Sequence, residues 1–125
     1  MSNHRVMVVD DSRVVYSEMM KMLEGSEFEI VCFCRNGEEA LEKYPEIKPE
    51  LVTLDIVMPG MDGLETCQKL KESHPDAQIF MVSSLAYNDI IDRAVSLGAK
   101  GFLFKPFTKE SLLEGLRGAF KVIGR

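Results

Sequence analysis

The sequence predicts an α/β protein built around a doubly wound, five-stranded parallel sheet. Five short apolar runs alternate with segments whose apolar residues repeat with the period of a helix. The fourth run, residues 78–82, is almost wholly apolar, which is typical of a central parallel strand buried on both faces. Right-handed crossovers through the intervening helices would cover both faces of such a sheet.

The first apolar run predicts a strand over residues 5–9, followed by a helix. Ser12 is a favoured N-cap residue, and Gly25 is a typical helix stop. One face of the helix carries apolar residues at helical spacing, namely Val15, Met19, Met22 and Leu23.

The second strand is predicted over residues 29–34, where Cys32 and Cys34 point to the same face of the sheet because side chains alternate along a strand. A turn at Asn36 leads into a helix over residues 38–44. Pro45 and Pro49 are expected to bracket the following loop. A short apolar run between Pro49 and Pro59 predicts a third strand over 51–54, and it is followed by a predicted helix over 63–73 that ends before Pro75.

The last two units repeat the same pattern. The fourth strand leads to a helix that is predicted to begin at an Asn88 or Asp89 cap and to run through Leu97. The fifth strand, residues 101–104, precedes a helix capped by Thr108. The apolar residues of that helix keep a helical period: Leu112, Leu113, Leu116, Ala119 and Phe120.

Length and composition predict one globular domain over residues 1–125. The net charge is −5 with acids and bases interspersed, which argues against direct nucleic-acid binding or an anionic membrane surface. No apolar run approaches the ~20 residues of a membrane helix, and the N-terminus lacks a signal peptide. The three cysteines have no histidine at a zinc-site spacing, so they are expected to be buried and reduced in a cytoplasmic protein.

Charged residues follow three of the predicted strands directly. Asp10 and Asp11 come after the first strand, Asp55 ends the third, and Lys105 follows the fifth. The carboxyl ends of parallel strands share one edge, where open α/β sheets bind ligands. Taken singly, the first two acids could cap a helix and the lysine could be solvated. Together they favour a functional site.

The chemistry of that site follows from its residue types. Three crowded carboxylates repel one another, which raises their pKa values unless a cation neutralises them. A site that offers only oxygen ligands, with no histidine or thiol nearby, favours a hard metal ion. We expect Mg²⁺, for which Mn²⁺ can substitute. Aspartate can accept a phosphoryl group covalently, and Lys105 and the Ser83 hydroxyl could stabilise phosphate oxygens.

These residues closely resemble the receiver domain of two-component response regulators. The resemblance rests on Asp10-Asp11, on Asp55 with the Met-Pro-Gly-Met-Asp-Gly segment 58–63, on Ser83 and on Lys105-Pro106-Phe107, and it spans essentially the whole chain. It implies a flavodoxin-like (βα)5 fold with strand order 2-1-3-4-5. The first and third strands would then be neighbours, with the acids at the point where the strand order reverses.

The resemblance also implies a role for each residue. Asp55 is similar to the phosphoacceptor, Asp11 and the Val57 backbone carbonyl to direct Mg²⁺ ligands, and Asp10 to a water-mediated one. A count of 22 positions back from Lys105 selects Ser83 over Ser84 as the hydroxyl at the site. Phe102 occupies the position of a switching aromatic residue, with a plain core role as the equal alternative. The Lys105–Pro106 peptide bond is expected to be cis.

The implied function is a phosphorylation-dependent signalling module. A histidine kinase would supply the phosphoryl group. A protein effector, either a flagellar switch or an output domain, would bind the face formed by the predicted helix that ends at Leu97, the strand 101–104 and the helix capped by Thr108. The module is not a conventional enzyme, although it assists its own phosphorylation and autodephosphorylation. Hydrolysis is expected to be slow, because Val57 and Leu85 are apolar where fast members carry polar side chains. A monomer that can dimerise on phosphorylation is expected.

The sequence alone leaves other functions of the chain open. The chain ends at Arg125, directly after the last helix, which fits a stand-alone regulator as in chemotaxis or the receiver domain of a larger DNA-binding or enzymatic regulator. A haloacid-dehalogenase-like phosphatase would need an Asp-x-Asp motif after the first strand, where these acids are adjacent. A constitutive pseudo-receiver would not need the full residue set. Flavodoxin-like cofactor binding would need a phosphate-binding loop instead of acids.

Overall fold

A computed structural model describes residues 3–85 and 87–124, so both ends of the expected domain, Met1 and Arg125, lie outside the described residues. The strands are β1 (His4–Val9), β2 (Phe28–Cys34), β3 (Leu51–Asp55), β4 (Ile79–Ser83) and β5 (Phe102–Phe104). The helices are α1 (Arg13–Leu23), α2 (Gly37–Ile47), α3 (Gly63–Ser73), α4 (Asn88–Ser96) and α5 (Lys109–Val122).

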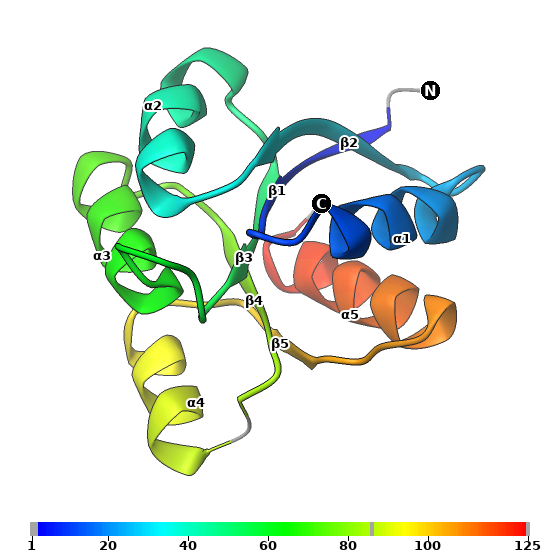
Figure 1. Cartoon of the computed structure of the whole chain (residues 1–125). Helices are drawn as coiled ribbons and strands as arrows, with labels where there is room; N and C mark the ends of the chain where they lie inside the picture. Colours follow the sequence, from blue (N-terminus) through cyan, green and yellow to red (C-terminus); the bar gives the residue numbers. More distant parts are fainter. Residues whose placement is uncertain (1–2, 86, 125) are drawn as a thin grey trace.

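All strand pairs are parallel and the order is β2-β1-β3-β4-β5, which confirms the predicted fold. Helices α1 and α5 lie on one side of the sheet, and α2, α3 and α4 on the other (Figure 1). Within the described residues, no helix is both long enough and apolar enough to cross a membrane.

Each face of the sheet has its own hydrophobic core. One cluster lies under α1 and α5, and the other lies under α2, α3 and α4. The ring of Phe80 sits in the first cluster between two glycines. A methyl group on Gly101 would come 2.6 Å from this ring, and one on Gly115 would come 2.9 Å from it. The absence of both side chains therefore lets α5 and the start of β5 close over the ring.

A β-bulge in the edge strand β2 decides which face its side chains occupy. Val6 pairs with Ile30, but the next residue, Met7, pairs with Cys32, so Val31 is an extra residue. A shift of one residue reverses the side-chain faces of a strand. Ile30 accordingly packs in the cluster under α1 and α5, whereas Cys32 and Cys34 belong to the cluster on the α2 side. The two cysteines share a face as predicted.

Helix α2 is longer than predicted. It continues through Pro45 to Ile47, where a loop was expected. Proline removes one backbone donor from a helix, but Lys48 adopts a left-handed conformation and donates back to Tyr44 O at 2.8 Å. The Arg5 guanidinium donates to the carbonyl oxygens of Ile47 at 2.7 Å and Lys48 at 2.8 Å. This contact from β1 stabilises the end of the helix.

The predicted cap of α4 was wrong by one residue. Tyr87, in an extended conformation, is the N-cap residue and provides no side-chain hydrogen bond. Its carbonyl oxygen accepts the N–H groups of Ile90 and Ile91, both at 3.1 Å. The helix therefore begins at Asn88, one residue earlier than a cap at Asn88 would place it. Asp89 lies inside the first turn, where a negative charge is favourable. The caps Ser12 and Thr108 are confirmed.

Thr53, in the central strand β3, is 1% exposed, and its hydroxyl oxygen has no hydrogen-bond partner among the described residues. We expect Thr53→Val to raise the free energy of unfolding by about 1 kcal/mol, because it removes a buried unsatisfied polar group from a site that keeps its shape. Urea denaturation measures the change. Thr66→Val is the control, since the equally buried Thr66 hydroxyl donates to Asp62 O at 2.8 Å and its loss should destabilise. Stabilisation by both substitutions would contradict this account.

Candidate functional site

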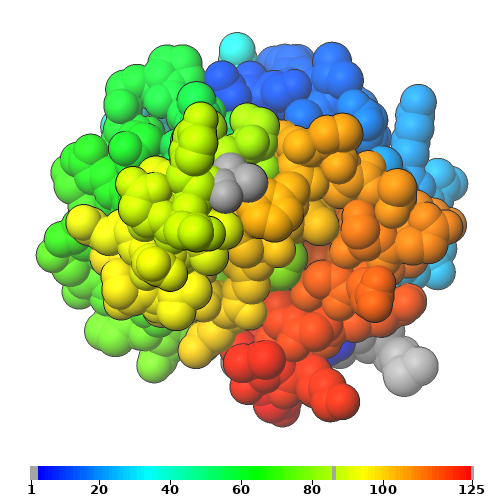
Figure 2. Space-filling model, turned by 90° about the horizontal axis from the view of Figure 1, so that it is seen from below, coloured from blue at the N-terminus to red at the C-terminus, as the bar shows by residue number. Residues whose placement is uncertain are grey.

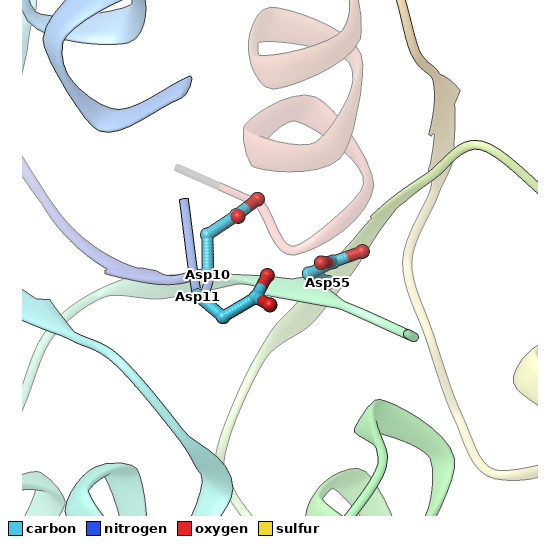
Figure 3. Close-up of side chains that lie close together, drawn as sticks. All are labelled: Asp10, Asp11 and Asp55. Atoms are coloured by element: carbon cyan, nitrogen blue, oxygen red, sulfur yellow. The ribbon is translucent and has the colours of Figure 1, made fainter. Parts of the chain in front are cut away.

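Three acids meet where β1 and β3 end. Asp10 and Asp55 are buried, and Asp11 is exposed at the rim. One oxygen from each carboxylate lies within 4.8 Å of the others. The Asp11 carboxylate is directed toward Asp55 (Figure 3). This donor set consists of hard oxygen ligands, so its chemistry fits Mg²⁺ and does not fit a metal that prefers nitrogen or sulfur.

Asp10 is held in place through both its carboxylate oxygens and its backbone. Oδ1 accepts the backbone N–H of Ser12 at 2.9 Å, and Oδ2 accepts a hydrogen bond from Lys105 Nζ at 2.8 Å. The Asp10 N–H donates to the Cys34 carbonyl oxygen at 3.0 Å. The N-cap residue of α1 is Ser12, not Asp10. Asp10 therefore positions the start of the helix through Oδ1 and keeps Oδ2 for the site.

Lys105 brings a positive charge between the two buried acids. Its Nζ lies 2.8 Å from Asp10 Oδ2 and 3.4 Å from Asp55 Oδ2. Burial alone would lower the pKa of Lys105, but the hydrogen bond and charge of Asp10, together with the charge of Asp55, raise it. The Lys105–Pro106 peptide bond is cis, as predicted. The backbone N–H of Lys105 donates to Ser83 O at 2.9 Å, which ties the end of β5 to β4.

The pKa of Asp55 is raised from 3.8 to about 6. Burial is the largest cause, and the charge of Asp10 adds to it. Lys105 and the backbone N–H of Val57 act in the opposite direction. The lysine therefore neutralises the acids only in part, and the site still favours an additional cation.

The loop after Asp55 is fixed by a close backbone approach at Gly63, the first residue of α3. Its N–H donates to Ile56 O at 2.8 Å. A Cβ atom at Gly63 would overlap the Asp55 carbonyl oxygen and lie 2.7 Å from Ile56 Cα. Val57 is 50% exposed at the mouth of the site. Only glycine lets the start of α3 pack this closely against the backbone that carries Asp55.

Ser83 ends β4 and Phe102 begins β5, and neither side chain joins the hydrogen-bond network of the acids in this structure. Ser83 is fully buried, and its Oγ accepts the backbone N–H of Leu85 at 3.1 Å. The half-buried Phe102 ring packs against the core under α4, with its centroid 5.0 Å from that of the partly exposed Phe104. Ser84 is exposed.

A polar hollow of about 390 Å³ adjoins the acids on the α2 side. Asp11 lines it together with Arg35, Asn36, Glu38, Glu39 and Pro59. Arg35 is the basic residue of this lining, and sequence reasoning missed it. The only signal in the sequence is its place next to the predicted cap Asn36, at the carboxyl end of a strand.

Comparisons with known proteins agree with this geometry. A family model described as the response regulator receiver domain matches residues 6–117. Chemotaxis protein CheY of Listeria monocytogenes is 38% identical over 117 residues, which cover 94% of this chain and 98% of the relative. CheY of Halobacterium salinarum is 40% identical over 112 residues, covering 90% and 92%.

Solved structures give the same result. A chain of the CheX–CheY–BeF3–Mg²⁺ complex from Borrelia burgdorferi superposes with a TM-score of 0.87 at 29% identity, covering 97% of this chain and 90% of that one. A CheY-like receiver domain protein from Methanospirillum hungatei gives a TM-score of 0.84 at 26% identity, with 97% and 96% covered. From sequence and structure alike, this chain belongs to the receiver-domain family of response regulators, the signalling modules of two-component systems.

Proposed function

We propose that the chain acts as one receiver domain that accepts a phosphoryl group on Asp55 from a histidine kinase and thereby changes its affinity for a protein effector. The observation that carries this proposal is the position of Asp55. It lies at the end of a buried central strand, next to Asp10 and Asp11 and 3.4 Å from the Lys105 ammonium group. A phosphorylatable carboxylate needs such neighbours, because phosphoryl transfer depends on positioning and on neutralisation of charge.

In this proposal Asp10, Asp11, Asp55 and the Val57 carbonyl oxygen hold Mg²⁺, or Mn²⁺ in its place, with Asp10 acting through water. The ion supplies positive charge for the phosphoryl oxygens when it is bound. An Asp55 carboxylate oxygen attacks phosphorus, and the bond to the donor histidine nitrogen breaks with its electron pair left on that nitrogen. A pKa of about 6 leaves roughly nine-tenths of Asp55 ionised at pH 7, so the nucleophile is available. Lys105 and the Ser83 hydroxyl then stabilise the phosphate oxygens.

Chemical phosphorylation of the purified protein tests this proposal. Incubation with acetyl phosphate and Mg²⁺ should add one phosphoryl group, and reduction with borohydride followed by peptide mapping should locate it on Asp55. Excess EDTA should prevent the addition. A phosphoryl group on another residue, or an unchanged yield in EDTA, would refute the assignment.

We propose that the effector binds the face formed by α4, β5 and α5. Atoms of α4 and of the segment around β5 lie side by side on this surface (Figure 2). It exposes apolar side chains, with Val95 64% and Phe104 44% accessible. A hollow of about 200 Å³ between α4 and β5 is lined by Ala94, Val95, Ala99, Lys100, Gly101 and Phe102. An apolar surface of this kind suits a protein partner, a flagellar switch or an output domain.

A concerted movement of Ser83 and Phe102 would connect the site to that face. If the phosphoryl group draws the Ser83 hydroxyl away from Leu85 N, the space it leaves can admit the Phe102 ring. We expect amide chemical-shift changes on addition of BeF3⁻ and Mg²⁺ to concentrate between residues 83 and 120. Asp55→Asn under the same additions is the control and should show none of these changes. Changes confined to the rim, with Phe102 unaltered, would argue against the switch.

The phosphorylated state is expected to be long-lived, because Val57 and Leu85 offer no hydrogen bond to an attacking water. Val57→Asn combined with Leu85→Glu should speed loss of the phosphoryl group about tenfold, since a polar side chain can orient the water. The decay of labelled protein in Mg²⁺ without kinase measures this rate. Val57→Ala with Leu85→Met, which changes shape but adds no hydrogen-bonding group, should stay closer to the wild-type rate. Equal decay in the polar variant would show that these side chains do not govern hydrolysis.

A further inference from the structure

Two of the three cysteines lie in contact on the edge strand. The Sγ atoms of Cys32 and Cys34 are 3.8 Å apart, and both residues are free thiols. Cys34 is fully buried, while Cys32 is partly exposed. The bulge at Val31 turns both side chains under α2. We propose that Cys32 and Cys34 form a binding site for one soft, sulfur-seeking cation of low coordination number, with Cu(I) as its representative.

The side chains around the two thiols favour a soft metal ion. Met7, the pairing partner of Cys32 on β1, is fully buried in the same cluster, so a thioether stands among the neighbouring side chains. In residues 3–85 and 87–124, the only group of three potential His, Cys, Asp or Glu ligands is the acidic one at the rim. The thiol pair therefore lacks the further ligands that tetrahedral Zn²⁺ needs. Thiolate and thioether sulfur favour Cu(I).

The distance between the sulfurs is close to what such an ion requires. With metal–sulfur bonds of about 2.3 Å, a linear sulfur–metal–sulfur unit spans about 4.6 Å. The present separation of 3.8 Å must then grow by about 0.8 Å, which a rotation of the partly exposed Cys32 side chain can provide. The site faces α2 from an edge strand, so it is not enclosed by strands on both sides.

Binding converts two thiols to thiolates: one Cu(I) enters, two protons leave to solvent, and the site changes from neutral to a net charge of −1. Burial raises the pKa of the Cys34 thiol, and neighbouring Cys32 raises it further. The proton is therefore displaced only by a cation with a strong preference for sulfur. The negative charge of Glu39 also raises this pKa, and the positive charge of Lys43 lowers it, so the two neighbouring charges act in opposite directions on the thiolate.

A metal ion bound by the two thiols would affect the acidic site through one backbone hydrogen bond. The Cys34 carbonyl oxygen accepts the Asp10 N–H at 3.0 Å, so a shift of Cys34 changes the environment of that amide. Cys67, the third thiol, is buried on α3 and is not part of the pair. It serves as a matched control for non-specific binding to a thiol.

The test uses the reduced whole chain under anaerobic conditions, with Cu(I) buffered by a chromophoric chelator. We expect one Cu(I) per wild-type chain by native mass spectrometry. Either Cys32→Ser or Cys34→Ala should lower the affinity about 100-fold or more, since loss of a direct ligand exceeds the effect of an outer-shell change. Cys67→Ser should bind as the wild type does. The Asp10 amide resonance should move on Cu(I) addition in the wild type and stay unchanged in Cys32→Ser.

Several results would overturn the proposal. Full retention of Cu(I) by Cys32→Ser would show that the ion does not need the thiol pair, because Cys34, Cys67 and the methionines all remain in that variant. Zn²⁺ binding as tight as Cu(I) binding would refute the selection for a soft ion. Circular dichroism checks that each variant is folded, and Cys32→Ser, at the partly exposed position, decides the matter if Cys34→Ala proves unstable.

Discussion

Replacement of Asp55 by asparagine is expected to abolish phosphoryl transfer and, at pH 7, to raise the free energy of unfolding by up to about 3 kcal/mol. The first effect follows from loss of the proposed nucleophile. The second follows from burial, which raises the pKa of Asp55 from 3.8 to about 6. Each pKa unit corresponds to about 1.4 kcal/mol. The charged side chain destabilises the fold, and the neutral amide removes this penalty while Lys105 keeps its bond to Asp10.

The direction of the Asp55 pKa shift determines how the stability difference between the two proteins depends on pH. A carboxyl group whose pKa is raised on folding carries no penalty below its unfolded pKa, and the penalty grows as pH rises from about 3.8 to about 6. The wild type and Asp55→Asn should therefore be equally stable near pH 3.5 and differ most above pH 6. Urea denaturation without divalent ions at both pH values measures the difference. Asp92→Asn, at an exposed position on α4, should leave stability unchanged. Lower stability of Asp55→Asn at pH 7, or phosphoryl incorporation into it, would contradict this expectation.

Gly63→Ala is expected to destabilise the protein by about 3 kcal/mol and to slow phosphorylation of Asp55 in the molecules that remain folded. The added methyl group would overlap the Asp55 carbonyl oxygen and approach Ile56 Cα to 2.7 Å. These are backbone atoms, which cannot move away as a flexible side chain can. The strain must therefore displace either α3 or the end of β3, and β3 carries the phosphoacceptor.

Gly118 provides the matched control for Gly63. It lies on the exposed side of α5, and a methyl group there would meet no atom within 4 Å. Gly118→Ala should stabilise the helix by up to about 1 kcal/mol, because alanine is the better helix former. Denaturation and acetyl phosphate labelling of both variants give the comparison. A Gly63→Ala protein with wild-type stability and labelling rate would show that the loop can relax around the methyl group.

The elements of the fold could largely be predicted because each is encoded locally. The apolar run before Asp55 predicts a buried strand, and Ser12 and Thr108 are capping residues whose side chains act within one turn. The carboxyl ends of parallel strands meet at one edge, so the sequence also placed Asp10 and Lys105 together. The strand order came from the resemblance to receiver domains, since periodicity does not determine which strands are neighbours.

The features that could not be predicted depend on contacts between distant residues. The end of α2 is held by Arg5, more than 40 positions away, so Pro45 alone suggested a helix end that is too early. The bulge at Val31 arises from pairing with β1 and leaves no local signal. The Ser83 hydroxyl binds Leu85 N in this structure, a choice among rotamers that the sequence does not specify.

The ring of Phe80, held between Gly101 and Gly115, has a consequence for how this chain can change over evolutionary time. The two glycines are far apart in sequence but both contact the same side chain. A larger residue at either position is therefore tolerated only after position 80 becomes smaller. Two alanines that are harmful beside phenylalanine could become neutral beside a smaller side chain. The three positions should therefore be inherited as a set, and the order in which substitutions occur decides which sequences remain within reach.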